Sequence, residues 1–133
     1  MVMAEHPDCA LVRRGYELFN KGDMETLATM MTRDCAHHVP GSNPLSGHHK
    51  GIDNVMALYR RMGEMTQGNM RGELEGLFAD GRGHVMSVHR NVAERDGRGY
   101  NQRGGIFFTI VGGKISDLDE CVEDIDLEDE FWS

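Results

Sequence analysis

The hydrophobic period of the chain changes at Gly68, and this change constrains the fold more than any other feature. After Gly68, apolar and polar residues alternate, which is typical of strands with one buried face. Short turns such as Asp96-Gly97 and Gly112-Gly113 separate the alternating runs, so consecutive strands should form an antiparallel meander. The strands are predicted at residues 70–78, 84–94, 100–111 and 114–123.

Before this point the apolar spacing is mainly helical. Pro7 suits the first position of a helix that ends at Lys21-Gly22, and Asp23 suits the N-cap of a second helix. The sequence further predicts a short strand at residues 35–39, a polar loop and a third helix at residues 51–65. Three N-terminal helices can cover one face of a bent sheet and leave a cavity between, which predicts an α+β fold.

The composition restricts the partners and the compartment. A net charge of −8 speaks against a nucleic-acid partner, because phosphate binding needs a basic face. No apolar run approaches the ~18 residues of a membrane span, and residues 1–10 lack the features of a secretory signal. Three cysteines without CxxC spacing indicate reduced thiols, so we expect a cytoplasmic protein with one domain at residues 1–133.

Several segments together resemble one superfamily. Residues 12–23 resemble the opening helix of the nuclear transport factor 2-like superfamily, and within it of the SnoaL-like proteins, relatives of polyketide cyclases and ketosteroid isomerase. Four further segments match in order, at residues 34–41, 51–55, 112–115 and 129–132. The resemblance implies a cone-shaped fold with a deep pocket, a small-molecule ligand and a homodimer through the sheet. It does not imply one reaction, because this fold hosts enzymes and non-enzymatic binders alike.

Two chemistries of the superfamily lack their residues in this chain. Aligned with the steroid isomerases, the positions of the tyrosine, the base and the late acid carry Gly15, Val39 and Ile106. Aligned with the limonene epoxide hydrolases, Arg90 matches the arginine, but the two aspartate positions carry Val92 and Cys121. The resemblance to polyketide cyclases implies a late aspartate as acid or base, which Asp117 or Asp119 could supply.

Strand alternation selects further candidates. In the last strand it puts Asp117 and Asp119 on one face and Glu120 on the other. We expect Asp119 to face the apolar cavity and act as a catalytic acid or base, because burial would raise its pKa toward neutrality. In the strand at 84–94 we expect Arg90 to bind a ligand oxygen or pair with Asp119, and His89 to lie on the outer surface.

The segment from Asp34 to Gly51 carries four histidines. His37 and His38 are adjacent in a strand, so at most one of them faces the pocket, where it could act as an acid, a base or an orienting group. His48 and His49 lack the spacing of known metal motifs, and we expect them in a solvated loop. The sequence therefore predicts no metal site and no cofactor.

Two functional hypotheses follow. The first is a cofactor-independent isomerase, cyclase, dehydratase or hydrolase that acts by acid/base chemistry on an apolar, oxygen-bearing metabolite. The second is a non-catalytic ligand-binding or dimerisation module. The catalytic candidates are Asp119, His38 and His37, and the substrate-binding candidates are Arg90, Tyr59, Tyr16, Met62, Ile106, Phe108 and Asp117. Packing alone is the competing interpretation for both tyrosines.

Overall fold

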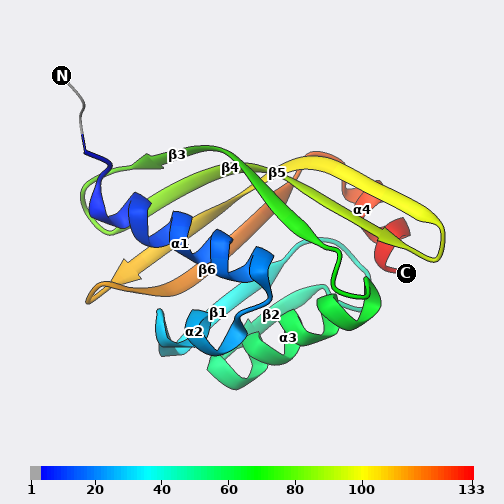
Figure 1. Ribbon diagram of the computed structural model, residues 1–133, viewed down its shortest axis with the longest axis horizontal. Coiled ribbons are helices and arrows are strands. Elements are labelled where there is room, and N and C mark those ends of the chain that lie inside the picture. The colour runs from blue at the N-terminus through cyan, green and yellow to red at the C-terminus, as the bar shows by residue number, and fades with distance from the viewer. Residues whose placement is uncertain (1–3) are drawn as a thin grey trace.

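A computed structural model describes residues 4–133. Its helices are α1 (Pro7–Lys21), α2 (Met24–Thr29), α3 (Ile52–Met65) and α4 (Ile125–Trp132). Its strands are β1 (Met31–Val39), β2 (Gly47–Lys50), β3 (Arg71–Ala79), β4 (His84–Arg95), β5 (Arg98–Val111) and β6 (Lys114–Val122). The strands form one mixed sheet in the order β2-β1-β6-β5-β4-β3, in which β1 is parallel to β6 and the other neighbours are antiparallel (Figure 1).

The second half of the chain confirms the expected meander. The strands β3 to β6 pair in sequence order, and their bounds lie close to the predicted ones. The turn between β4 and β5 contains Asp96 and Gly97, both with positive φ, at 51° and 76°. Two successive residues in this region match the right-handed twist of the strands that they join. Local turn chemistry therefore determines this part of the topology.

In the first half of the chain, the structure differs from the prediction in two places. β1 begins at Met31, four residues before the predicted start, and the segment expected to be a polar loop contains β2. The chain between these strands turns back on itself, because the N–H of Asn43 donates to Ser46 Oγ at 2.9 Å and the Ser46 hydroxyl donates to the Pro40 carbonyl at 3.0 Å. This turn returns β2 antiparallel to β1, with Val39 opposite Gly47.

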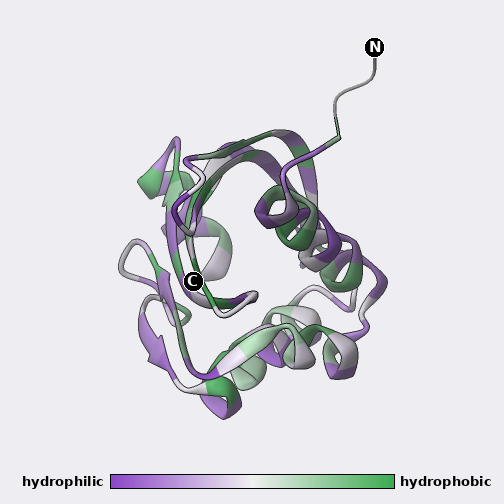
Figure 2. Ribbon diagram, turned by 90° about the vertical axis from the view of Figure 1, so that its left-hand side faces the viewer, coloured by the Kyte–Doolittle hydropathy of each residue, from purple (hydrophilic) through white to green (hydrophobic). Residues whose placement is uncertain are grey.

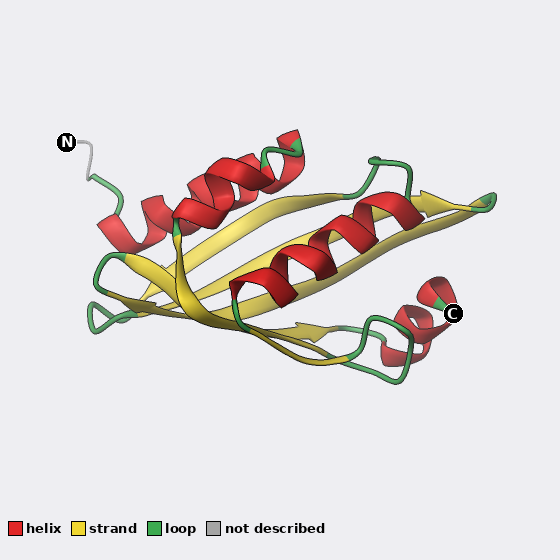
Figure 3. Ribbon diagram, turned by 90° about the horizontal axis from the view of Figure 1, so that it is seen from below, coloured by secondary structure: helices red, strands yellow, loops and turns green. Residues whose placement is uncertain are grey.

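Helices α1 and α3 cover one side of the curved sheet (Figure 3). Pro7 opens α1, and Gly22 closes it in the left-handed region with φ 77°. α1 packs against β3 and β4, while α3 packs against β1 and β2. Seen nearly end on, the sheet bends round toward these helices (Figure 2). The core and the cavity described below lie between the helices and the concave face of the sheet. The α+β cone with three N-terminal helices is thus confirmed, with α4 added.

Gly104 and Gly105 mark a sharp bend in β5. A Cβ on Gly104 would lie 2.6 Å from the Cys121 carbonyl oxygen, and one on Gly105 would lie 2.2 Å from the Ser87 carbonyl oxygen. Any side chain at either position would therefore displace backbone. Beside the bend, Ser87 Oγ accepts a hydrogen bond from the N–H of Ile106 at 2.9 Å, so the buried N–H remains satisfied.

The acidic C-terminal segment docks on the body through α4. Phe131 and Trp132 are buried, and the Trp132 indole N–H donates to Glu128 Oε1 at 3.0 Å. Tyr100 and Gln102 of β5 donate to the other carboxylate oxygen of Glu128. Burial raises the pKa of Glu128. The tail thus closes the far end of the sheet with a buried, fully bonded carboxylate.

None of the described helices combines the length and the apolar character needed to cross a membrane.

We predict that Trp132→Ala lowers the free energy of unfolding by about 3–5 kcal/mol, because it empties a fully buried site and removes a donor from Glu128. Urea unfolding followed by circular dichroism measures this change. Ile125→Ala, on the same helix but 43% exposed, is the control and should cost less than about 1 kcal/mol. Equal losses in both variants would contradict the docking role of Trp132.

Candidate functional site

A cavity of about 80 Å³ lies between α1, α3 and the concave face of the sheet. Its wall is mainly apolar, with polar side chains contributed by the strands and one tyrosine each by α1 and α3. Concave, largely apolar sites with a few convergent polar groups are typical of small-molecule binding. The apolar lining consists of Phe19, Leu27, Met31, Met62, Met70, Ile106, Phe108, Ile115 and Leu118, with Gly15 and Gly72. The polar lining consists of Tyr16, His37, Tyr59, His89, Asn91 and Glu120.

His37 lies at the centre of one hydrogen-bonded chain. Its Nδ1 lies 2.8 Å from the Tyr59 hydroxyl of α3, and its Nε2 lies 2.8 Å from Glu120 Oε1 of β6. The Asn91 amide of β4 donates to Glu120 Oε2 at 3.2 Å. The side chains of His37 and Glu120 are only 5% and 8% exposed. A carboxylate that fixes one imidazole nitrogen leaves the other able to exchange a proton with a hydroxyl.

Tyr16 organises a second polar group beneath α1. Its hydroxyl lies 2.5 Å from His89 Nδ1 and 2.8 Å from Ser87 Oγ, both on β4. The tyrosine ring packs close to the backbone of Gly72, where a Cβ would lie 3.1 Å from it. Asn20, one helical turn beyond, exchanges two hydrogen bonds of 2.9 Å with the backbone of Gly72. These contacts fix the Tyr16 hydroxyl over the sheet.

Burial and hydrogen bonding determine which of these groups are ionised. Burial opposes the ionisation of Glu120. The hydrogen bond and the charge of His37, together with the hydrogen bond from Asn91, favour ionisation and hold the pKa of Glu120 below its ordinary value. Burial lowers the pKa of His89. Burial also raises the pKa of both Tyr16 and Tyr59. At neutral pH the site therefore holds one ionised carboxylate among protonated tyrosines and a neutral His89.

The expected position of Asp119 is wrong. Thr109 of β5 pairs with Asp117, but Ile110 pairs with Ile115, so Ser116 is an extra residue in β6. This bulge inverts the alternation after Ile115, because each inserted residue turns the next side chain to the opposite face. Asp119 is therefore exposed on the outer face and Glu120 lines the cavity. Asp117 does not line the cavity either.

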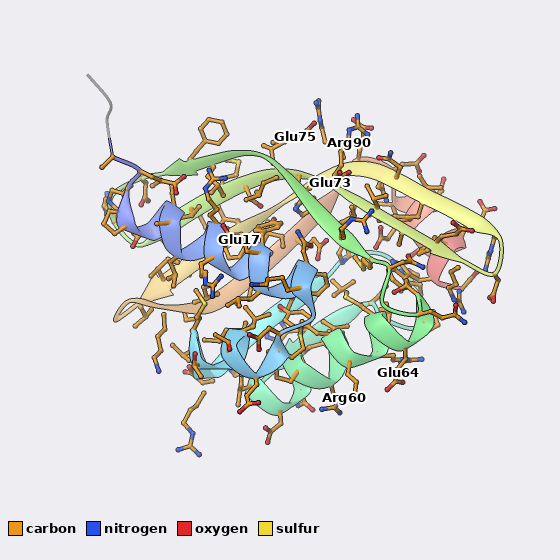
Figure 4. The ribbon with its side chains drawn as sticks, in the orientation of Figure 1. Glu17, Arg60, Glu64, Glu73, Glu75 and Arg90 are labelled. Carbon is orange, nitrogen blue, oxygen red and sulfur yellow. The ribbon has the colours of Figure 1, made fainter. Side chains whose placement is uncertain are left out.

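Arg90 and His89 also exchange their expected positions. The structure shows that Ser87, His89 and Asn91 form the buried face of β4. Arg90 lies on the outer face, where Nε is 3.7 Å from Glu75 Oε2 (Figure 4). The expected pairing of Arg90 with Asp119 is therefore wrong. Alternation defines two faces but does not indicate which one is buried, and both faces of β4 carry polar residues.

The histidines of residues 37–49 divide as alternation requires. His37 is buried in the cavity wall, whereas His38 is exposed and its ring lies 5.9 Å from that of His48 on β2. His49 Nε2 bonds the carbonyl of Leu45 at 2.8 Å. Within residues 4–133, no group of three histidine, cysteine or carboxylate side chains has a geometry that could hold a metal ion.

Five predicted ligand-binding residues do lie in the cavity wall. They are Tyr16, Tyr59, Met62, Ile106 and Phe108. Sequence reasoning missed three polar members, His89, Asn91 and Glu120. Asn91 and His89 share one face of a strand, so correct assignment of that face would have found both. Glu120 was hidden by the bulge, for which the sequence of β6 offers no signal that we recognise.

Comparison with known proteins identifies relatives of this chain. The sequence profile described as the SnoaL-like domain matches residues 12–118. The uncharacterized protein Rv0034 of Mycobacterium tuberculosis is 34% identical over 131 residues, which cover 98% of this chain and all of that protein.

Solved structures share the fold. Bal32a, from a soil-derived mobile gene cassette, is 35% identical, with a TM-score of 0.93 over 96% of this chain and 97% of Bal32a. A putative polyketide cyclase of Pseudomonas putida is 20% identical, with a TM-score of 0.76 over 97% of this chain and 100% of the other. At 20% identity, the similarity to the putative polyketide cyclase shows a shared fold only.

We predict that Glu120→Gln destabilises the protein at pH 7 by about 1–3 kcal/mol, because it removes a charge-assisted hydrogen bond. The folded pKa of Glu120 lies below its ordinary value of 4.5, so its contribution is present above that value and is lost as pH falls through the folded pKa. The difference in unfolding free energy between wild type and variant should therefore shrink below about pH 4.5. Urea unfolding between pH 3.5 and 7 tests this. The exposed neighbour Asp119→Asn should show a small difference, and a constant Glu120→Gln difference would refute the charge assignment.

Proposed function

This chain belongs to the SnoaL-like domain family of the nuclear transport factor 2-like superfamily, and we propose that it is a small-molecule enzyme. It acts by acid/base chemistry on an apolar metabolite that carries one or two oxygens, as an isomerase, cyclase, dehydratase or hydrolase. The observation that carries this proposal is the hydrogen-bonded chain from Tyr59 through His37 to Glu120 in the cavity wall.

His37 is the proposed proton carrier. Glu120 accepts a hydrogen bond from His37 Nε2, which fixes the ring and stabilises the imidazolium that forms when Nδ1 takes a proton. Nδ1 contacts the Tyr59 hydroxyl, which can pass the proton to or from a ligand. Asn91 holds the second carboxylate oxygen of Glu120. These groups can move a proton by themselves, so the proposed step uses no metal or organic cofactor.

The remaining wall supports an apolar ligand. Met62, Ile106 and Phe108 contribute apolar surface from α3 and β5. Tyr16 and Tyr59 remain protonated because burial raises their pKa. The Tyr16 hydroxyl is engaged by His89 Nδ1, whereas the Tyr59 hydroxyl can turn its hydrogen from His37 Nδ1 to a ligand oxygen. Such a donor, placed where negative charge develops on an oxygen, would stabilise an enolate or alkoxide.

A second candidate function is non-catalytic binding. It is favoured by the mutual satisfaction of Tyr59, His37, Glu120 and Asn91, whose hydrogen bonds already form a closed chain. A fully bonded network can serve to rigidify a pocket. The fate of the ligand distinguishes the two functions, because an enzyme converts it and a binding protein leaves it chemically unchanged.

We also propose a homodimer through the outer face of the sheet. Phe78, Met86 and Phe107 are opposite one another on β3, β4 and β5 and are 62%, 51% and 45% exposed. Beside this apolar row, Glu75 pairs with Arg103 at 3.1 Å. An exposed apolar row flanked by both charges suits a second copy of the same face.

We predict that His37→Gln lowers the turnover rate at least about 100-fold, because general acid/base groups contribute that much or more. Thermal-shift screening of ketones, lactones and epoxides identifies the substrate, and mass spectrometry follows its conversion. Glu120→Gln should lose activity to a similar degree, because His37 then lacks its charged partner.

His38→Ala and Asp119→Asn are the matched controls for this experiment, since both residues are exposed neighbours of the proposed pair. They should retain activity within about twofold. Full activity in His37→Gln and Glu120→Gln would overturn the mechanism. A ligand that raises the melting temperature but is never converted would support non-catalytic binding instead.

For the dimer, we predict that Phe107→Glu yields a monomer, because it places a charge within the apolar row. Sedimentation velocity compares it with wild type, and Val111→Glu, 56% exposed at the end of β5, is the control. A monomeric wild type would refute this part of the proposal.

A further inference from the structure

His89 carries a buried nitrogen without a partner. The residue lies on β4 in the cavity wall and is 1% exposed. Its Nδ1 contacts the Tyr16 hydroxyl at 2.5 Å, but its Nε2 has no hydrogen-bond partner among residues 4–133. An orphaned buried polar group in a native protein calls for an explanation, and a functional role or a bound molecule is the common one.

The hydrogen bonds of Tyr16 and Ser87 indicate which nitrogen of His89 carries the proton. Ser87 Oγ accepts a hydrogen bond from the N–H of Ile106 at 2.9 Å. The Ser87 proton has two acceptors within reach, the Tyr16 oxygen at 2.8 Å and the Ile106 carbonyl oxygen at 3.3 Å. The shorter contact identifies Tyr16 as the acceptor. The Tyr16 hydroxyl is then left to donate to His89 Nδ1. Nδ1 is therefore the acceptor, and Nε2 carries the hydrogen and is a free donor.

The fold holds this donor in place in the cavity wall. A Cβ on Gly104, which is paired with His89 across the β4–β5 ladder, would lie 3.3 Å from Nε2. The Cys121 carbonyl oxygen would lie 2.6 Å from the same Cβ, so this side of Nε2 is closed, and a ligand group would approach from the cavity that His89 lines. Tyr16 packs against the imidazole with its ring centroid 5.6 Å away. A donor with fixed orientation is suited to receive a ligand group without rearrangement.

The charges around the cavity restrict the group that His89 can receive. Among the described residues, no lysine or arginine lines the cavity, and the carboxylate that lines it is Glu120. Burial lowers the pKa of His89, so its imidazole is neutral. An anionic ligand would meet the ionised carboxylate of Glu120, whose partner His37 is already engaged with it, and no lysine or arginine among the lining residues would offset the added charge. In a buried site this repulsion is poorly screened. The oxygen received must therefore be uncharged.

We propose that His89 Nε2–H donates a hydrogen bond to an uncharged oxygen of the ligand, such as a carbonyl, and so serves as a catalytic residue distinct from the His37 and Glu120 pair. The inference rests on the proposed function in one respect, that the ligand occupies this cavity. Tyr16 and Ser87 act through His89, because they set its tautomer and orientation. Carbonyl polarisation by a neutral imidazole complements proton transfer by His37.

Cyclohexanone labelled with ¹³C at the carbonyl is the probe, and binding is measured by calorimetry and by the infrared frequency of the bound carbonyl. Methylenecyclohexane has the same shape without the acceptor, and cyclohexanecarboxylate carries a negative charge. His89→Asn places an amide near Nδ1 and deletes the donor at Nε2, whereas His89→Gln restores a donor near Nε2. His84→Phe, a half-buried residue at the start of the same strand, is the control.

Wild type should bind cyclohexanone at least about tenfold more tightly than either comparison ligand, which corresponds to one neutral hydrogen bond. The bound carbonyl should absorb at lower frequency than in an apolar solvent. In His89→Asn this shift and the tenfold preference over methylenecyclohexane should disappear, and His89→Gln and His84→Phe should keep both.

An unchanged carbonyl frequency in His89→Asn would overturn the proposal, as would tighter binding of the carboxylate or no binding of cyclohexanone to wild type. If His89→Asn fails to fold, Tyr16→Phe serves in its place, because it removes the proton that forces hydrogen onto Nε2 and should weaken the shift. These readouts need no turnover. A chain that binds and polarises the ketone without converting any substrate would overturn acid/base catalysis and leave intact the assignment of His89 as the hydrogen-bond donor to the ligand.

Discussion

The curvature of the sheet at Gly104 and Gly105 is the constraint on which the rest of the structure depends. Backbone carbonyl oxygens lie where a Cβ of either residue would be, so only glycine allows β5 to follow this path. The bend turns the sheet toward the helices and creates a concave face. Without it the helices would pack flat on the sheet and leave no cavity of the observed kind.

The bend also organises the polar groups of the site. Ser87 satisfies the Ile106 N–H beside it, and the same hydroxyl contacts Tyr16, which in turn contacts His89. A backbone feature of the sheet is thereby connected to the side chains of the cavity. The bulge at Ser116 has a comparable effect on β6, because it exchanges an aspartate for Glu120 at the cavity wall. Local irregularities of the sheet therefore decide the chemistry available inside.

The site combines a buried charge pair with an apolar wall. A buried carboxylate is tolerated because His37 and Asn91 bond both of its oxygens. The same carboxylate disfavours anionic ligands and fixes the ring of His37 through Nε2. One interaction thus contributes to stability, to ligand selection and to the proposed proton transfer. The second buried carboxylate, Glu128, lies among the side chains of α4 and β5 and secures the C-terminal helix.

The sequence by itself determined the first three helices, a strand near β1, the meander β3 to β6, its hairpin turns and the family, because these depend on local periodicity, glycine positions and motif order. It also indicated that at most one of His37 and His38 faces the pocket. The tertiary structure decided which face of β4 is buried, since polar residues occupy both of its faces, and where the alternation of β6 inverts. It therefore placed His89 and Glu120 inside and Arg90 and Asp119 outside. These outcomes depend on pairing between strands distant in sequence, which local patterns do not contain.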